Sequence, residues 1–148
     1  MRLSEATAKA EGVPAEIAGR EKVDKCEFGG VFTMDLPPIL KLTPKTQVGS
    51  DGKKTVLMSP TTGKPYYKRT VFIPFEADGK KYYTASNSPL LFALFRDFPV
   101  REETENDKGI KWIFLDDVIE GSLRFTKKPY EYGSRVGTKP VTTIEEAD

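Results

Sequence analysis

Alternating hydrophobic and polar residues predict β-strands through the middle of the chain. Phe32, Met34 and Leu36 alternate with Val31, Thr33 and Asp35, which is typical of one half-buried strand. Shorter β-rich runs between turn residues predict further strands at 39–42, 55–58, 110–115 and 122–132.

A β-hairpin is predicted over residues 66–86, because two β-rich runs flank Asp78-Gly79, a strong signal for a two-residue turn. In this register Glu76 lies opposite Lys81, and their opposite charges favour the pairing. The face predicted to form the core carries Val71, Ile73, Phe75 and Tyr82. The face predicted to point outward carries Phe72, Pro74, Lys81 and Tyr83.

One buried helix is predicted near 88–98, since Ser88 suits the N-cap, Pro89 suits the first helical position and the following residues are almost all apolar. Residues 1–25 are predicted to be a weakly helical or mobile segment, and residues 133–148 a flexible acidic tail.

The domain between these ends, residues 26–132, has the order of elements expected of an α+β protein. Strands, a hairpin, a helix and more strands follow one another as in an OB-type five-stranded antiparallel barrel, in which a helix closes the bottom. A five-stranded antiparallel sheet packed on one helix would give a similar sequence pattern.

Composition narrows the class of protein. A chain of 148 residues with 38% hydrophobic and 11% aromatic residues fits one folded domain. It has no His and one Cys, which removes the usual proton shuttle, a thiolate zinc cage and an internal disulfide. It also has no apolar run long enough to span a membrane and no secretory segment. We therefore expect a soluble cytoplasmic protein, in a bacterial or phage-infected cell, that does not bind membranes.

Charge is segregated although the whole chain is nearly neutral at +1. Residues 41–83 hold nine Lys and Arg against three Asp and Glu, and residues 121–140 hold five against one. The acidic residues gather instead in 101–120 and 141–148. This segregation indicates a surface that faces a polyanion, with a patchy solvated surface as the alternative.

Paired tyrosines stand beside cations on both arms of the predicted hairpin. A nucleotide base can stack on an aromatic ring while a neighbouring cation meets its phosphate. The even-numbered positions from 124 to 132 include further cations and tyrosines, and they lie along one face of a predicted strand. Ordinary strand aromatics and a charged protective edge are the structural alternatives. The predicted nucleic-acid-binding residues are Lys64, Tyr66, Tyr67, Lys68, Arg69, Phe72, Lys81, Tyr83, Arg124, Lys127, Lys128, Tyr130 and Tyr132.

Other chemistry-bearing residues point less clearly to a function. Trp112 and Phe114 are expected in the core, with a stacking role as the alternative. The carboxylates between Glu102 and Glu120 could hold Mg²⁺, although a solvated acidic loop is the favoured interpretation. Cys26 is expected to be an incidental thiol. Since no phosphate-binding loop or His-based triad exists, we predict no catalytic residue, metal site or cofactor, and no enzymatic activity.

The run KRTVFIPFEADGKKYYTASNSPLLFALF (68–95) resembles the central part of small phage-type OB-fold single-stranded DNA-binding proteins. The shared features are a basic strand, a turn, Lys-Tyr-Tyr-Thr and a short apolar helix. The tail is similar to that of bacterial single-strand-binding proteins, although Glu145-Glu146-Ala147-Asp148 lacks their apolar ending. The resemblance covers under a third of the chain and implies an accessory role in replication or recombination.

The sequence therefore predicts a sequence-tolerant single-stranded DNA-binding protein. Its expected partners are single-stranded DNA and, through the acidic tail, replication or recombination proteins; a homo-oligomer is compatible with this role. The alternative is a protein–protein adaptor or structural phage component that uses the same exposed aromatics. A third hypothesis is a Mg²⁺-dependent nuclease.

Overall fold

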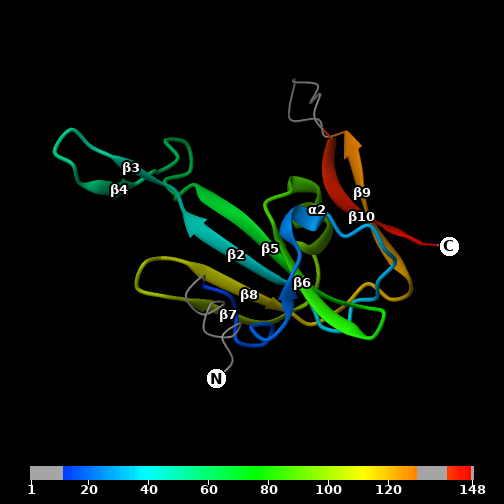
Figure 1. Ribbon diagram of the computed structural model, residues 1–148. Helices are drawn as coiled ribbons and strands as arrows, with labels where there is room; N and C mark the ends of the chain where they lie inside the picture. Colours follow the sequence, from blue (N-terminus) through cyan, green and yellow to red (C-terminus); the bar gives the residue numbers. More distant parts are fainter. Residues whose placement is uncertain (1–11, 130–139, 148) are drawn as a thin grey trace.

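The computed structural model describes residues 12–129 and 140–147 and consists mostly of β-structure (Figure 1). Its main sheet has the strand order β1-β6-β5-β2-β8-β7. These strands span Glu21–Lys22 (β1), Ile39–Pro44 (β2), Tyr67–Ala77 (β5), Lys80–Ser86 (β6), Val100–Glu105 (β7) and Lys111–Leu115 (β8). Only the short β1–β6 pair is parallel among the described strand pairs.

Two smaller sheets accompany the main one. β3 (Thr46–Val48) pairs with β4 (Lys54–Val56), and β9 (Leu123–Pro129) pairs with β10 (Pro140–Glu146). The described helices are α2 (Pro89–Phe95) and a 3₁₀ turn, η1 (Asp24–Cys26). The fold is thus β-rich with one short α-helix in the described residues, as predicted. Its sheets are open, so the predicted closed five-stranded barrel is not shown. Among the described helices, none has the length and apolar character needed to cross a membrane.

β5 lies at the centre of the main sheet, and its residues Val71–Phe75 are all buried. Val71, Ile73 and Phe75 point to one face, as the period of two along a strand requires. Leu91 and Phe95 of α2 cover this face together with residues of β9 and of the 26–34 segment, and the set forms the main core. The core face predicted from the sequence is confirmed.

The hairpin of β5 and β6 has the predicted register, with Glu76 opposite Lys81 and Phe75 opposite Tyr82. Asp78 and Gly79 form the turn with φ values of 51° and 75°. Both residues are therefore in the left-handed region, as the commonest two-residue hairpin turn requires. The start of the helix is also as predicted: the Ser88 hydroxyl accepts a hydrogen bond from the backbone N–H of Leu91. The helix ends at Phe95, earlier than expected.

The opposite face of β5 is also covered, so the prediction that Phe72 and Tyr83 face outward is wrong. Their exposed fractions are 5% and 2%. They form a second core with Ile17 and Ile39, against which Trp112 packs. The physical reason is that residues 13–18 fold over this face and place Ile17 on it.

The described part of the N-terminal segment, residues 12–25, forms turns, β1 and η1 rather than α-helix, because Val23 and β1 pair with the edge of β6 instead of coiling. At the other end, residues 140–146 form β10 instead of a flexible tail. The β-branched residues of Val141–Ile144 suit a strand, and β10 pairs with β9 along its whole length. Residues 1–11, 130–139 and 148 lie outside the described residues.

Between β2 and β5 the chain leaves the sheet and returns, and we call residues 45–66 the arm. Figure 1 shows the β3–β4 hairpin of the arm projecting from the body of the molecule. Three backbone hydrogen bonds join its root: Leu57 N–H donates to Lys45 O (2.8 Å), Lys45 N–H to Tyr66 O (2.8 Å) and Tyr66 N–H to Leu57 O (3.0 Å). The root is therefore a defined structure continuous with β2 and β5.

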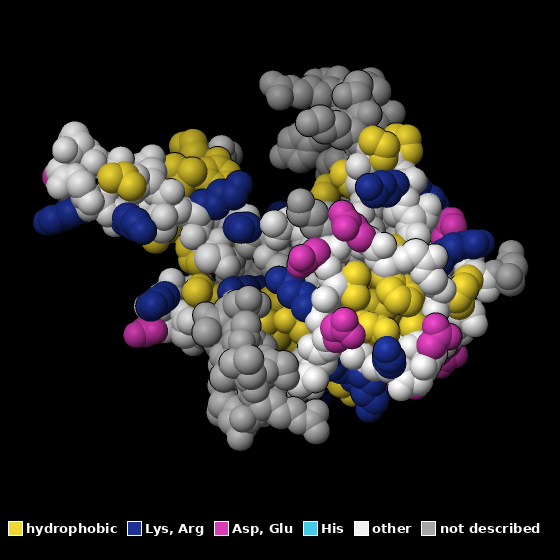
Figure 2. Space-filling model, in the orientation of Figure 1, with side chains coloured by type: hydrophobic (Ala, Val, Ile, Leu, Met, Phe, Trp, Pro, Cys, Tyr) yellow, Lys and Arg dark blue, Asp and Glu magenta, His cyan; other side chains and the backbone are white. Residues whose placement is uncertain are grey.

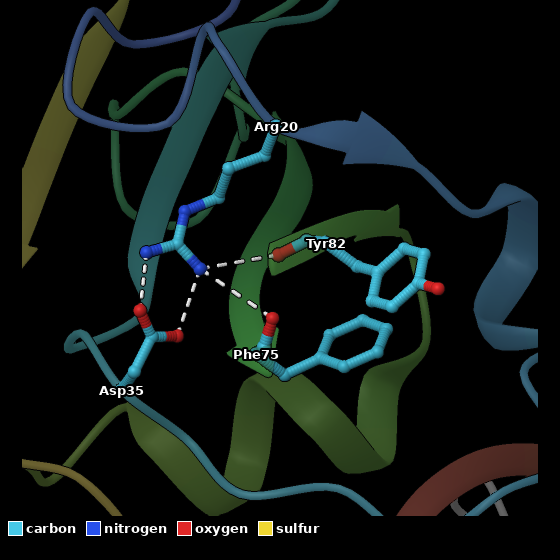
Figure 3. A network of polar contacts seen from close by, with 4 residues as sticks. All are labelled: Arg20, Asp35, Phe75 and Tyr82. Carbon is cyan, nitrogen blue, oxygen red and sulfur yellow. Dashed lines mark hydrogen bonds and ion pairs between the residues drawn. The ribbon is translucent and has the colours of Figure 1, made fainter. Parts of the chain in front are cut away.

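Arg20 ties the N-terminal segment to the main sheet (Figure 3). Its guanidinium binds both carboxylate oxygens of Asp35 and donates to the backbone oxygens of Phe75 (3.4 Å) and Tyr82 (3.3 Å). Only 8% of the Arg20 side chain is exposed. A buried guanidinium needs such a set of acceptors, because an unpaired charge in the interior is strongly unfavourable.

We expect Arg20→Ala to lower the free energy of unfolding by about 3 kcal/mol, because it leaves Asp35 and two backbone oxygens without their donor. Urea denaturation measures this difference. Arg96→Ala is the control: Arg96 is exposed and forms a surface ion pair with Asp97, so its loss should change stability by less than about 0.5 kcal/mol. Equal effects of the two substitutions would contradict the assigned role of Arg20.

Stability should also depend on pH through Asp35. Burial acts to raise the pKa of Asp35, but the hydrogen bonds and charge of Arg20 outweigh it, so this pKa lies below its usual value. Asp35 therefore stabilises the fold fully above the ordinary aspartate pKa of about 3.9, and this contribution disappears as pH falls through the lowered pKa. Urea titrations at decreasing pH should show the wild type losing its stability advantage over Asp35→Asn. A constant difference down to the acid limit would contradict this account.

Candidate nucleic-acid interface

An open hollow of about 450 Å³ lies where the arm, β5 and the start of α2 meet. We call it the basic groove. Its lining residues are Lys45, Pro65, Tyr66, Tyr67, Lys68, Arg69, Asn87, Pro89 and Phe92. Three of these described residues are cations, three carry aromatic rings and none is acidic. Figure 2 shows Lys and Arg side chains along the arm and where the arm joins the body.

Cations in and beside the groove rest on aromatic rings. The Arg69 guanidinium lies 4.8 Å from the centroid of the Phe92 ring, and the Lys111 ammonium lies 5.8 Å from that of Tyr67. Such contacts attract a cation to the ring face without neutralising its charge. The ion pairs found among the described residues involve no groove cation. The groove thus keeps its positive charge available to an anion.

The arm root fixes the tyrosine side of the groove. The three backbone hydrogen bonds among Lys45, Leu57 and Tyr66 hold Lys45 and Tyr66 next to the first residues of β5. Tyr66 is 43% exposed, so its ring is accessible from solvent. An accessible ring beside a cation is the arrangement that stacks a base and meets its phosphate.

Lys68 borders the groove, but it alternates with Tyr67 and Arg69 along β5, so its side chain starts from the other face of the sheet. On that face the positive charge of Lys68 acts on Lys41. Burial and, after it, the positive charge of Lys68 lower the pKa of Lys41. The Lys41 ammonium also lies 4.9 Å from the centroid of the Trp112 ring. Positive charge therefore borders the groove on this side as well.

Two further hollows extend this surface toward β9. The first shares Asn87 and Pro89 with the basic groove and continues to Lys127. The second shares Glu27, Lys127 and Thr142 with the first and ends beside Phe28, so these two hollows carry one acidic residue beside Lys127. The hollows therefore adjoin one another, and they connect the 66–69 segment with Lys127, two parts of the chain predicted separately to bind nucleic acid.

Other predicted residues lie elsewhere. Arg124 forms an ion pair with Glu145 of β10 at 2.9 Å, which offsets its charge. Lys128 is exposed but alternates with Lys127, so it starts from the opposite side of β9. Leu123 is buried, and Phe125 packs against the main core.

Lys81 lies far from the groove although it follows a similar sequence pattern. It pairs with Glu76, eight residues along β5 from Lys68, which corresponds to roughly 26 Å of extended strand. Phe72 and Tyr83 are inside the second core. Lys64 is exposed in the loop before Pro65 and is not among the residues that line the groove. Tyr130 and Tyr132 lie outside the described residues.

The structure adds residues that the sequence-based prediction missed. Lys45, Asn87, Phe92 and Lys111 come from four separate segments and meet only through the fold. Lys45 had a signal in the sequence, since it belongs to the basic block 41–83. Phe92 had none, because an aromatic residue in an apolar helix is normally part of the core.

Trp112 takes the structural role favoured from the sequence, whereas the acidic residues 102–105, although exposed, form a strand instead of the expected loop. Trp112 packs partly buried against the second core, with its ring 5.7 Å from that of Phe72. Glu102, Glu103 and Glu105 are exposed on β7. In the part of the chain that the structure describes, no group of three or more Asp, Glu, His or Cys side chains could hold a metal ion.

Comparisons with known proteins give no relationship: no family model, curated protein or solved structure matches this chain significantly. The resemblance of residues 68–95 to phage-type single-stranded DNA-binding proteins stays a prediction.

Cys26 should be chemically inert in the folded protein. Its side chain is 5% exposed, and its backbone N–H and thiol both donate to the Thr84 hydroxyl, at 3.1 and 3.5 Å. Burial raises the pKa of the Cys26 thiol, although its hydrogen bonds act in the opposite direction. Because the thiolate is the reactive form, we expect modification by a disulfide reagent to be slow in buffer and fast in denaturant. Rapid modification of the native protein would contradict this burial.

Proposed function

We propose that this protein binds single-stranded nucleic acid, with DNA as the expected substrate and little preference for sequence. The observation that supports the proposal is the basic groove, where cations and aromatic rings from separate segments line one acid-free hollow. Bases would stack on Tyr66 and Tyr67 while Lys45 and Arg69 meet the phosphates. Aromatic faces accept every base, so such a surface is tolerant of sequence.

The two adjoining hollows support a path longer than one nucleotide. A strand that leaves the groove past Asn87 would reach Lys127 on β9. This path uses the second basic block of the sequence, whereas Lys81 and the buried Phe72 and Tyr83 have no part in it. An OB-type architecture and an accessory role in replication or recombination belong to the same proposal, and they rest on the sequence resemblance.

Titration of fluorescently labelled oligo-dT tests the proposal directly. We expect affinity to fall steeply as salt rises, because each neutralised phosphate releases counterions and contributes about 0.7 to the slope of log K against log salt. Tyr66→Ala should weaken binding by roughly 5- to 150-fold, the equivalent of about 1–3 kcal/mol for one stacked base.

Two exposed residues away from the groove provide controls. Val31→Ala removes an apolar side chain that is 53% exposed, and Lys80→Gln removes a charge at the turn of the β5–β6 hairpin. Both variants should bind oligo-dT as the wild type does. Absence of binding by the wild type at low salt, or equal losses in Tyr66→Ala and Val31→Ala, would refute the proposed interface.

A further inference from the structure

We propose that the arm holds double-stranded DNA, so that the protein recognises the junction between a duplex and a single strand. This inference rests on the proposed function and adds the class of substrate. It follows from the shape, the charge and the position of the arm.

The shape of the arm suits a groove of a DNA duplex. β3 and β4 form an antiparallel ribbon of two strands, and all six of their residues are exposed. Among the described strands they pair only with each other. The major groove of B-DNA is about 12 Å wide and admits a two-stranded β-ribbon. From Lys45 to Val48 the arm extends about 10 Å at the usual rise of a strand, and the turn at residues 49–52 forms its tip.

The charge of the arm suits a polyanion. Residues 45–66 contain four Lys and one Asp, a net charge of +3. Lys53 and Lys54 follow the loop at the tip. The one carboxylate, on Asp51, accepts the backbone N–H of Lys53 at 3.0 Å. A ribbon with Lys at its tip can therefore meet phosphates on either side of a groove.

Apolar side chains occur on the same face of the ribbon as Lys54. Val48 lies directly opposite Lys54, and Val56 is two residues farther along β4. Their exposed fractions are 66% and 44%, and that of Met58, which follows β4 and pairs with Pro65, is 48%. Apolar side chains in the major groove contact thymine methyl groups, while the intervening Lys meets the backbone. An apolar protein partner would leave this Lys without a complement, which favours DNA as the occupant.

The position of the arm connects the two kinds of DNA. Lys45, Pro65 and Tyr66 form its root and also line the basic groove. A strand that separates from a duplex on the arm would therefore enter the groove directly at the arm root. Two linked sites bind a substrate that fills both more tightly than either part, because the second contact becomes intramolecular.

The experiment compares three labelled DNAs: oligo-dT, a blunt duplex, and the same duplex with a dT tail. We expect the wild type to bind the tailed duplex at least about tenfold more tightly than oligo-dT. K53Q/K54Q should abolish this preference, leave oligo-dT affinity unchanged and reduce the salt slope for the tailed duplex by about 2. The matched control is K80Q/K81Q, which removes two adjacent Lys from the β5–β6 hairpin and should retain the preference.

A second variant replaces residues 46–56 with two glycines. The Leu57 N–H already donates to Lys45 O, so the chain can close there and keep the groove. This variant should bind oligo-dT as the wild type does and show no preference for the tailed duplex.

The possible results separate failure of the proposed function from failure of this inference alone. If oligo-dT is not bound, the proposed function fails and this inference fails with it. If oligo-dT is bound but the tailed duplex binds no more tightly than oligo-dT, only the inference is overturned. The same holds if K53Q/K54Q keeps the preference for the tailed duplex. If deletion of the ribbon lowers the molar mass in sedimentation without altering DNA preference, the arm binds a second copy of the chain and the inference is also overturned.

Discussion

The whole arrangement depends on the need to cover both faces of β5. Val71–Phe75 is an apolar run without polar alternation, and a strand of this kind is stable only when protein lies on each side of it. α2 and β9 cover one face, and Ile17 with the N-terminal turns covers the other. The Arg20–Asp35 contact fastens that second cover to the end of the β5–β6 hairpin. The basic end of β5, by contrast, meets α2 only at its edge, where Arg69 lies against Phe92, and Lys68 and Arg69 stay exposed.

Local signals in the sequence were sufficient for the hairpin and the helix, because Asp78-Gly79 and Ser88-Pro89 determine backbone geometry over a few residues. Alternation also divided β5 correctly into two faces. It could not tell that residues near Ile17 would cover the outer one, because that contact joins segments more than fifty residues apart. The strand β10 was missed because acidic composition outweighed the β-branched residues between Val141 and Ile144.

The candidate site also combines residues that local sequence identified with residues that only the fold brings together. Tyr66, Tyr67 and Arg69 were predicted from adjacent residues, and they do share one groove. Lys81 has a similar neighbourhood in the sequence, yet it belongs to the far end of the hairpin. Phe92 and Lys45 reach the groove only through the packing of α2 and the hydrogen bonds of the arm root. Sequence spacing identified the chemistry, whereas strand register determined which residues could act together.

The contact between Arg69 and Phe92 has a consequence for recognition. A free arginine samples many side-chain conformations and loses that freedom when it captures an anion. The guanidinium of Arg69 already lies against the ring, so part of this entropy loss occurs during folding. Its planar donors are thereby preorganised toward the solvent side of the groove, and a lysine, which lacks this planar stacking geometry, would not be an equivalent replacement.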